Sequence, residues 1–243
     1  MRDGLLVAVV GMLGWGMLTG GARAAGQSAA LTGTDTVLQQ ELAAVAGKHH
    51  GRVALYATQL NTGKTVGLDA DMPVQTASVI KLTILFEAME EVRDGRARWD
   101  ETLTLGKGDA VSGSGVVGLM DAPLTLTLKD VLTLMVVMSD NTATNLAIDR
   151  FGVGVVNQRI AWMGLKDTHL YKKIMKPATE PMPADQPKFG LGKTTPREMA
   201  TVMERIGRCE LTGPGEAALP GDAAICEVAL GMLKNQFCRD TIP

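Results

Sequence analysis

The sequence has 243 residues, enough for one large domain whose hydrophobic core is stable without a structural metal. Hydrophobic residues make up 46% and charged residues 21%, a composition that excludes collagen, a coiled coil and a disordered chain. A net charge of −2 and only 4% aromatic residues argue against nucleic-acid binding, so we expect a small-molecule substrate.

Residues 1–24 have the order of a secretory signal peptide. Arg2 precedes an apolar run at 4–18, and Ala22-Arg23-Ala24 supplies the small residues typical of a cleavage site. The run of about 15 residues is short for a membrane-spanning helix, which needs roughly 20, so we favour cleavage after Ala24 over an uncleaved anchor. We therefore expect a periplasmic or secreted protein with one domain at 25–243 and no stable membrane anchor after cleavage.

The rest of the chain predicts an α+β fold, in which a small antiparallel sheet accompanies a large helical body. Segment 36–48 has helical spacing and can be capped by Asp35, and 53–59 and 65–68 form a predicted β-hairpin. Further helices are expected at 78–92, 128–138, 143–151, 153–163, 195–206 and 223–236. Two strands alone do not form a stable sheet, so this set of strands is incomplete.

The first candidate catalytic motif is Ser78-Val79-Ile80-Lys81, at the start of a predicted helix. The helix dipole and its free N–H groups stabilise negative charge near the Ser78 oxygen. Lys81 lies one turn further on the same face, and a desolvated lysine can accept the serine proton in a chain with only three histidines. A capping serine followed by a solvated lysine gives the same spacing, so the motif alone is not specific.

The second motif is Ser139-Asp140-Asn141, between two predicted helices. Alone, the tripeptide indicates a helix end followed by a new N-cap. It begins 61 residues after Ser78, and the two motifs in this order are far more specific than either one.

Three cysteines are present, Cys209, Cys226 and Cys238. The last two lie in one predicted helix with a rise of about 18 Å between them, too far for a disulfide. Cys209 and Cys226 flank a Gly/Pro-rich loop and are the better pair. The sequence has no C-x-x-C motif, and we expect no metal site.

Together the two motifs and their flanking segments resemble the penicillin-recognising serine hydrolases, and among them the class A β-lactamases. NTGKTVGLDADMPVQTASVIKL resembles the family's hairpin and nucleophile helix, TLTLKDVLTLMVVMSDNTATNLAID the helices around the second motif, and KTTPREMA the segment after the Ω loop. The resemblance implies a β-lactamase/transpeptidase-like fold, a monomer, no cofactor, and β-lactam amide bonds opened through an acyl-serine intermediate.

The resemblance also assigns roles. Ser78 would be the nucleophile, Lys81 would carry its proton, and Ser139 would relay a proton to the β-lactam nitrogen. Asn141 would bind both Lys81 and the side-chain amide of the substrate, and the Ser78 N–H would be half of an oxyanion hole. The alternatives are a penicillin-binding peptidase or sensor that deacylates slowly and takes peptidoglycan-like substrates, or an inactive fragment.

The base for deacylation is open. In class A enzymes a glutamate of the Ω loop activates the hydrolytic water. Glu180-Pro181 resembles the family's Glu-Pro pair when positions are counted back from Pro196, whereas counting forward from 163–164 puts Ile174 there. Glu180 is therefore either this base or a solvated residue of a proline-rich surface loop.

The family's third motif, Lys-Thr-Gly, falls roughly a hundred residues after the second. The sequence ends 104 residues after Ser139 without it. We therefore expect a chain truncated before this motif that lacks the family's C-terminal strands and closing helix. Strand 53–59 should then have one unpaired edge and an uncovered apolar face.

Overall fold

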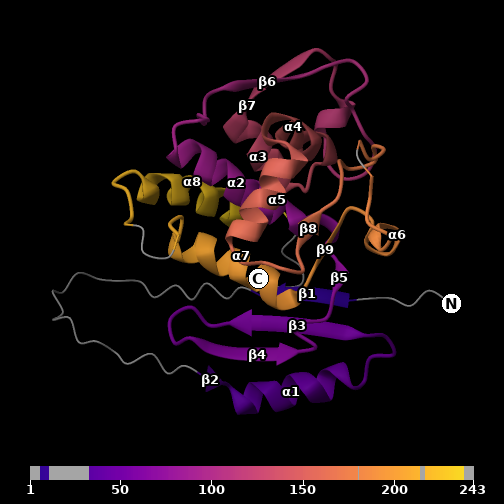
Figure 1. Cartoon of the computed structure of the whole chain (residues 1–243), viewed down its shortest axis with the longest axis vertical. Coiled ribbons are helices and arrows are strands. Elements are labelled where there is room, and N and C mark those ends of the chain that lie inside the picture. The colour runs from indigo at the N-terminus through magenta and orange to yellow at the C-terminus, as the bar shows by residue number, and fades with distance from the viewer. Residues whose placement is uncertain (1–5, 11–32, 180, 214–216, 238–243) are drawn as a thin grey trace.

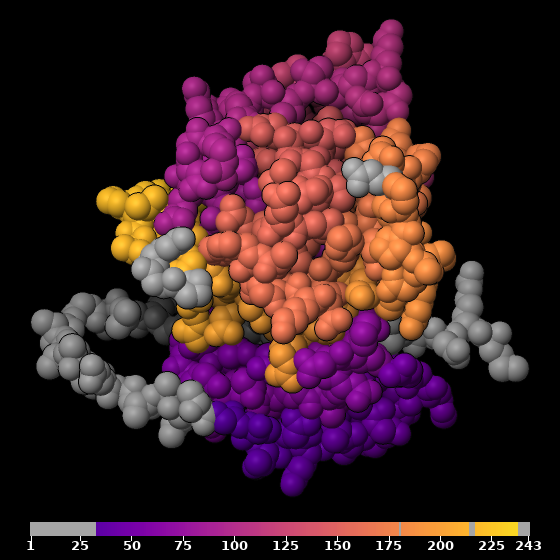
Figure 2. All heavy atoms as spheres, in the orientation of Figure 1, coloured from indigo at the N-terminus to yellow at the C-terminus, as the bar shows by residue number. Residues whose placement is uncertain are grey.

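The computed structural model describes residues 6–10, 33–179, 181–213 and 217–237. These residues form a helical body above a four-stranded sheet (Figure 1). In the space-filling view, residues 33–68 make the indigo and purple base, and the orange segment at 171–191 covers one flank of the helical body (Figure 2). The predicted α+β class is confirmed.

The main sheet has the strand order β1-β3-β4-β2. Its strands are β1 (Leu6–Val10), β2 (Gly33–Thr34), β3 (Val53–Thr58) and β4 (Lys64–Leu68). β3 and β4 are antiparallel and form the predicted hairpin. Helix α1 (Thr36–Ala46), capped by Asp35, lies on one side of the sheet, and helix α7 (Pro196–Arg208) lies on the other (Figure 1).

The outer edge of β3 differs from the prediction. β1 comes from the predicted leader and runs parallel to β3, with Leu6 opposite Val53 and Val10 opposite Ala57. The expectation of an unpaired edge is therefore wrong for a chain that keeps residues 6–10, and it stays an expectation for a chain that begins at Ala25. The physical reason is that the valine-rich run Leu6–Val10 favours extended backbone and can complete the hydrogen-bond ladder. The other residues of the predicted leader lie outside the described residues.

The α1 side of the sheet keeps apolar surface. Val37 and Val45 are each 67% exposed, and none of the α1 residues is buried. A groove separates α1 from β3 and β4, and its apolar lining is Leu38, Leu42, Leu55, Ala57 and Val66. The Gln39 side chain bridges to β4, donating to the Gly67 carbonyl and accepting from the Gly67 N–H at 2.6 and 2.8 Å.

Helix α2 (Lys81–Arg93) is the centre of the helical body (Figure 1). It packs against α7 and against α3 (Leu128–Val137), α4 (Asn141–Phe151), α5 (Val153–Trp162) and α8 (Asp222–Lys234). Its side chains Ile84, Leu85, Phe86 and Met89 are fully buried. Because α2 is surrounded, the residues at its N-terminus are held on a rigid element.

Two smaller sheets and one short helix escaped the sequence prediction. β6 (Thr102–Leu105) pairs with β7 (Leu124–Thr127), β5 (Val74–Gln75) pairs with β9 (Gly192–Thr194), β9 also pairs with β8 (His169–Leu170), and α6 is Gln186–Phe189. Thr and Leu alternate in β6 and β7, and this period of two residues could have predicted both strands. β5, β8 and β9 have only two or three residues each, too few to show a pattern.

A disulfide joins the end of α7 to α8. Cys209 directly follows α7 and is bonded to Cys226, with the two Cα atoms 5.6 Å apart. Cys238 lies outside the described residues. In the part of the chain that the structure describes, no helix combines the length and apolar character that a membrane crossing requires.

Candidate active site

Ser78 and Lys81 are placed by a single-turn 3-10 helix, Ala77–Ile80, that continues directly into α2. Strand β5 leads into this turn, and Ala77 has a φ of 42°, a left-handed conformation that is strained for alanine. The Ser78 side chain is exposed, whereas Lys81 is 3% exposed. The early N–H groups of a helix have no intrahelical acceptor, which leaves the Ser78 N–H available to a ligand.

The Lys81 ammonium group contacts the second motif. Its Nζ donates to the Ser139 carbonyl at 2.7 Å, to Ser139 Oγ at 3.0 Å and to Asn141 Oδ1 at 3.2 Å. The fold thus brings together three of the sequence-predicted residues from two motifs. Ser78 lies three residues before Lys81 and is exposed, and no hydrogen bond of its Oγ is found among the described residues.

Burial changes the acidity of Lys81. Desolvation lowers the pKa of its ammonium group to about 8, and the negative charge of Asp140 acts in the opposite direction. At pH 7 about a tenth of the molecules would then carry a neutral Lys81, many more than for a solvated lysine. A neutral lysine can accept a proton, so the site holds a base suited to activating a hydroxyl group.

Asp140 organises the loop beside the site, a role that its place in the tripeptide motif did not reveal. Its Oδ2 accepts hydrogen bonds from the N–H groups of Val116 and Val117 at 2.6 and 2.8 Å, and its Oδ1 caps α4 at the Ala143 N–H. The side chain is 1% exposed. Because its oxygens are occupied by backbone donors, Asp140 has a structural task rather than that of a free base.

The loop 111–117 is held against α4. Asn141 donates from its backbone to the Ser114 carbonyl and from Nδ2 to the Ser112 carbonyl, at 3.0 and 3.1 Å. Gly115 has a φ of 106°, and a Cβ atom there would lie 2.1 Å from Asp140 Oδ2. The glycines of this loop thus allow its backbone to lie close to α4.

Asn145 fixes a second loop one turn further along α4. Its Nδ2 donates to the Ile174 carbonyl at 2.9 Å, and its Oδ1 accepts from the Ile174 N–H at 2.8 Å. Lys176 Nζ donates to the Gly108 carbonyl at 3.0 Å, which ties the same loop to the segment before residue 111. Glu180, the sequence candidate for the deacylation base, lies outside the described residues. The loop residue that Asn145 contacts is Ile174, the residue that the forward count from 163–164 places at the position of the family's glutamate.

In the described part of the chain, no group of three or more His, Cys, Asp or Glu side chains is placed to hold a metal ion. The side chains that contact one another at the candidate site are those of Lys81, Ser139 and Asn141.

The helical body and the cluster around Lys81 place the chain among the penicillin-recognising serine hydrolases. It belongs to the β-lactamase enzyme family, since the family profile described as "Beta-lactamase enzyme family" matches residues 37–221. Among solved structures it is similar to PBP-A, with 26% identity and a TM-score of 0.70, over 85% of this chain and 71% of that one. A β-lactamase from Sphaerobacter thermophilus is 28% identical with a TM-score of 0.62, over 75% of this chain and 63% of that one.

A curated relative is the "Beta-lactamase regulatory protein BlaB" of Streptomyces cacaoi, 27% identical over 110 residues. The match covers 44% of this chain and 35% of the relative, so the chain spans about a third of that protein's length. One of the similar solved structures is a PBP-A variant in an acyl-enzyme complex with penicillin G, at 25% identity, a TM-score of 0.70, and 85% and 71% coverage of the two chains. Enzymes and a regulator thus both occur among the relatives.

Proposed function

We propose that this chain opens β-lactams through an acyl-enzyme formed on Ser78. The observation that carries the proposal is the buried Lys81, whose Nζ lies 3.0 Å from Ser139 Oγ and whose pKa is lowered to about 8. In this scheme Ser78 Oγ attacks the lactam carbonyl carbon while neutral Lys81 accepts the hydroxyl proton. The Lys81–Ser139 hydrogen bond provides the path by which a proton reaches the lactam nitrogen as the C–N bond breaks.

The first experiment is intact-protein mass spectrometry of the purified protein mixed with benzylpenicillin, followed by peptide mapping. We expect a mass increase of one penicilloyl group on the peptide that contains Ser78. The Ser78→Ala variant is the control and should remain unmodified. A folded protein without an adduct, or an adduct on the variant, would contradict the proposal.

After acylation, turnover requires a base that activates a water molecule. The rate of this step distinguishes a β-lactamase from a penicillin-binding protein or sensor that releases the acyl group slowly. A specific observation favours slow release. Asn145 binds the backbone of Ile174, the residue at the position of the family's glutamate by the forward count, and the Ile174 side chain has no group that accepts a proton. Without a base the ester bond of an acyl-enzyme persists. The remaining route to turnover is Glu180.

Two substitutions separate these outcomes. Glu180→Gln should lengthen the lifetime of the adduct if Glu180 activates the water, without changing the rate of its formation. Ile174→Glu should shorten the lifetime if the side chain at position 174 faces the acyl group. Adduct decay, followed by mass after removal of free penicillin, measures both. If the lifetime of the adduct were unchanged in Glu180→Gln, Glu180 would not be the base for deacylation, and slow release would be the favoured interpretation.

We also propose that the protein acts outside the cytoplasm after loss of its leader. The order of residues 1–24 supports this, and so does the Cys209–Cys226 disulfide, since such bonds persist in oxidising compartments. The mass of the protein recovered from the extracytoplasmic fraction tests it, with a chain beginning at Ala25 as the expected result.

A further inference from the structure

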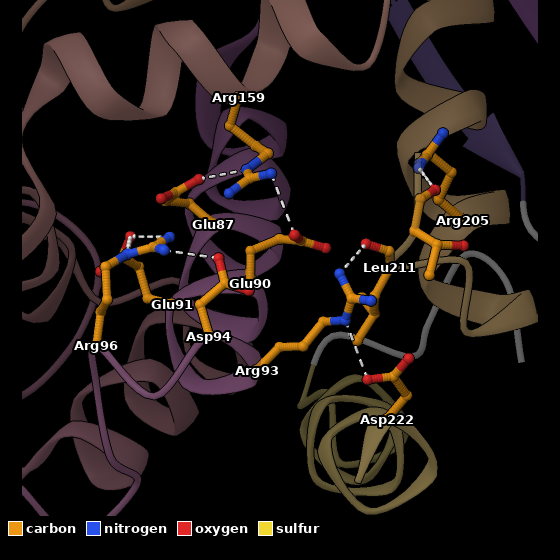
Figure 3. A network of polar contacts seen from close by, with 11 residues as sticks. Glu87, Glu90, Glu91, Arg93, Asp94, Arg96, Arg159, Arg205, Leu211 and Asp222 are labelled. Carbon is orange, nitrogen blue, oxygen red and sulfur yellow. Dashed lines mark hydrogen bonds and ion pairs between the residues drawn. The ribbon is translucent and has the colours of Figure 1, made fainter. Parts of the chain in front are cut away.

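Two glutamates of α2 share a single arginine in the protein interior (Figure 3). Glu87 and Glu90 are 1% and 2% exposed, and Arg159 of α5 contacts Glu87 Oε2 at 2.8 Å and Glu90 Oε2 at 3.1 Å. The second oxygen of each carboxyl group, Oε1, is buried without a hydrogen-bond partner in the described structure. Two buried acids therefore depend on one guanidinium group.

The neighbouring charged groups have contacts of their own, although Glu91 also raises the pKa of Glu87 and Arg93 lowers that of Glu90. These contacts are Arg93 with Asp222 and the Leu211 carbonyl, Arg96 with Glu91 and Asp94, and Arg205 with the Thr212 carbonyl. Figure 3 shows the Arg93 and Arg96 contacts on either side of the Arg159 pair, drawn from α2, α8 and the loop after α2. With both Glu87 and Glu90 ionised, the three side chains Glu87, Glu90 and Arg159 together carry a net charge of −1, which the charge of Arg93 offsets only in part from outside the cluster.

A buried excess charge is unfavourable, and a carboxyl group relieves it by binding a proton. We propose that the Glu87–Glu90–Arg159 cluster is a proton-binding site that stabilises the packing of α2 against α5 when one proton is bound and weakens it when that proton leaves. A protonated Glu90 leaves a neutral Glu87–Arg159 pair. This inference concerns folding stability and goes beyond the proposed reaction at Ser78.

The direction of the pH effect follows from the two states. Burial raises the pKa of Glu90 to about 7, against the ordinary value of 4.5, with Arg159 and Arg93 opposing the rise, and burial likewise raises the pKa of Glu87. Between pH 4.5 and 7 the folded chain keeps a proton that the unfolded chain has lost, so stability falls as pH rises through this window. Below and above the window this group contributes no further slope.

The test is thermal unfolding of the wild type and Glu90→Gln between pH 4.5 and 8. The side chain at position 90 is neutral at every pH in this variant, so its Tm should fall less with rising pH than the Tm of the wild type. The two curves of Tm against pH should therefore diverge as pH rises. The expected difference in the folding equilibrium constant across the window is on the order of a hundredfold. Glu204→Gln is the control, because Glu204 is a surface residue paired with Arg208 at 2.9 Å, and its curve should keep the wild-type slope.

A second measurement needs no stable Glu90 variant. The Glu90 carboxyl ¹³C resonance of the wild type should titrate near neutral pH, and Glu87→Gln should move this titration to lower pH because Glu90 then has Arg159 to itself. Identical Tm curves for the wild type and Glu90→Gln, or titration of Glu90 near 4.5, would overturn the proposal.

Discussion

At the scale of single residues, the protonation state of the candidate site depends on Lys81. Its three N–H groups match three acceptors, Ser139 O, Ser139 Oγ and Asn141 Oδ1, which is the bonding pattern of a charged ammonium group. Burial opposes that charge and lowers the pKa to about 8. The charged and neutral forms are therefore both accessible near neutral pH.

We predict that the acylation rate rises with pH below about 8 and levels off above it, because only neutral Lys81 accepts the Ser78 proton. The rate of penicilloyl adduct formation between pH 6 and 9.5 measures this. Lys81→Ala should slow acylation by roughly 10²- to 10⁴-fold and remove the rising limb. If Lys81→Ala kept the wild-type pH profile, the rise of the acylation rate with pH would come from another group.

Gly115 gives a second prediction at this scale. In Gly115→Ala the new Cβ would overlap Asp140 at 2.1 Å and require an unfavourable φ of 106°. We expect a loss of unfolding free energy of about 2–4 kcal/mol and slower acylation, since Asp140 precedes Asn141. Gly154→Ala in α5 is the matched control: nothing lies within 4 Å of its Cβ, and the change should stabilise the protein by about 0.5–1 kcal/mol. Chemical denaturation measures both.

At the scale of elements, Asn145 connects α4 to the loop of Ile174. Asn145→Ala removes two hydrogen bonds and leaves a buried N–H and C=O of Ile174 without partners. We expect destabilisation by about 2–4 kcal/mol and faster proteolysis within 171–185, whereas the Lys81–Ser139 contact should survive. Limited proteolysis with mass mapping tests this. Cleavage spread evenly over the chain would indicate global unfolding instead.

Sequence patterns predicted most long elements. The helices from α1 to α8 that carry apolar periodicity were expected within two or three residues, α6 excepted, and the β3–β4 hairpin followed from its turn residues. Strand Leu6–Val10 was not predicted, because an apolar run of this length also matches a signal peptide, and the prediction of a leader at 1–24 stays a prediction. Its pairing with β3 depends on a segment more than forty residues away.

The site was predicted to a similar extent. Ser78, Lys81, Ser139 and Asn141 belong to short motifs whose spacing is local, so the sequence could propose them as candidates, and the structure brings the last three into contact. The N-cap of α4 at Asp140 followed from the tripeptide, but the loop contacts of Asp140 and Asn145 were not predictable, since those partners lie 23 to 29 residues away in loops without periodicity. Long-range pairing of backbone groups is a property of the fold rather than of any motif.

At the scale of the whole molecule, the Cys209–Cys226 disulfide closes the loop between α7 and α8, two helices that both pack on α2. Its sequence separation of 17 residues corresponds to a stabilisation of about 3 kcal/mol from loop closure. We predict that the Cys209→Ser/Cys226→Ser double variant unfolds roughly 6–12 °C below the wild type. Differential scanning calorimetry measures this. An unchanged Tm would mean that the packing of α8 alone determines the stability of this region.

The two asparagines of α4 have a consequence for how the site can vary. Asn141 holds the loop 111–117 and Asn145 holds the loop of Ile174, four positions apart on one helix face. Four residues of an α-helix rise by about 6 Å, so the spacing of the two anchoring asparagines is set by the helix and not by the loops. Helix α4 therefore fixes the spacing of the points at which the two loops are attached. Insertions or deletions elsewhere in the two loops can therefore change the loops while the spacing of their anchoring asparagines stays constant.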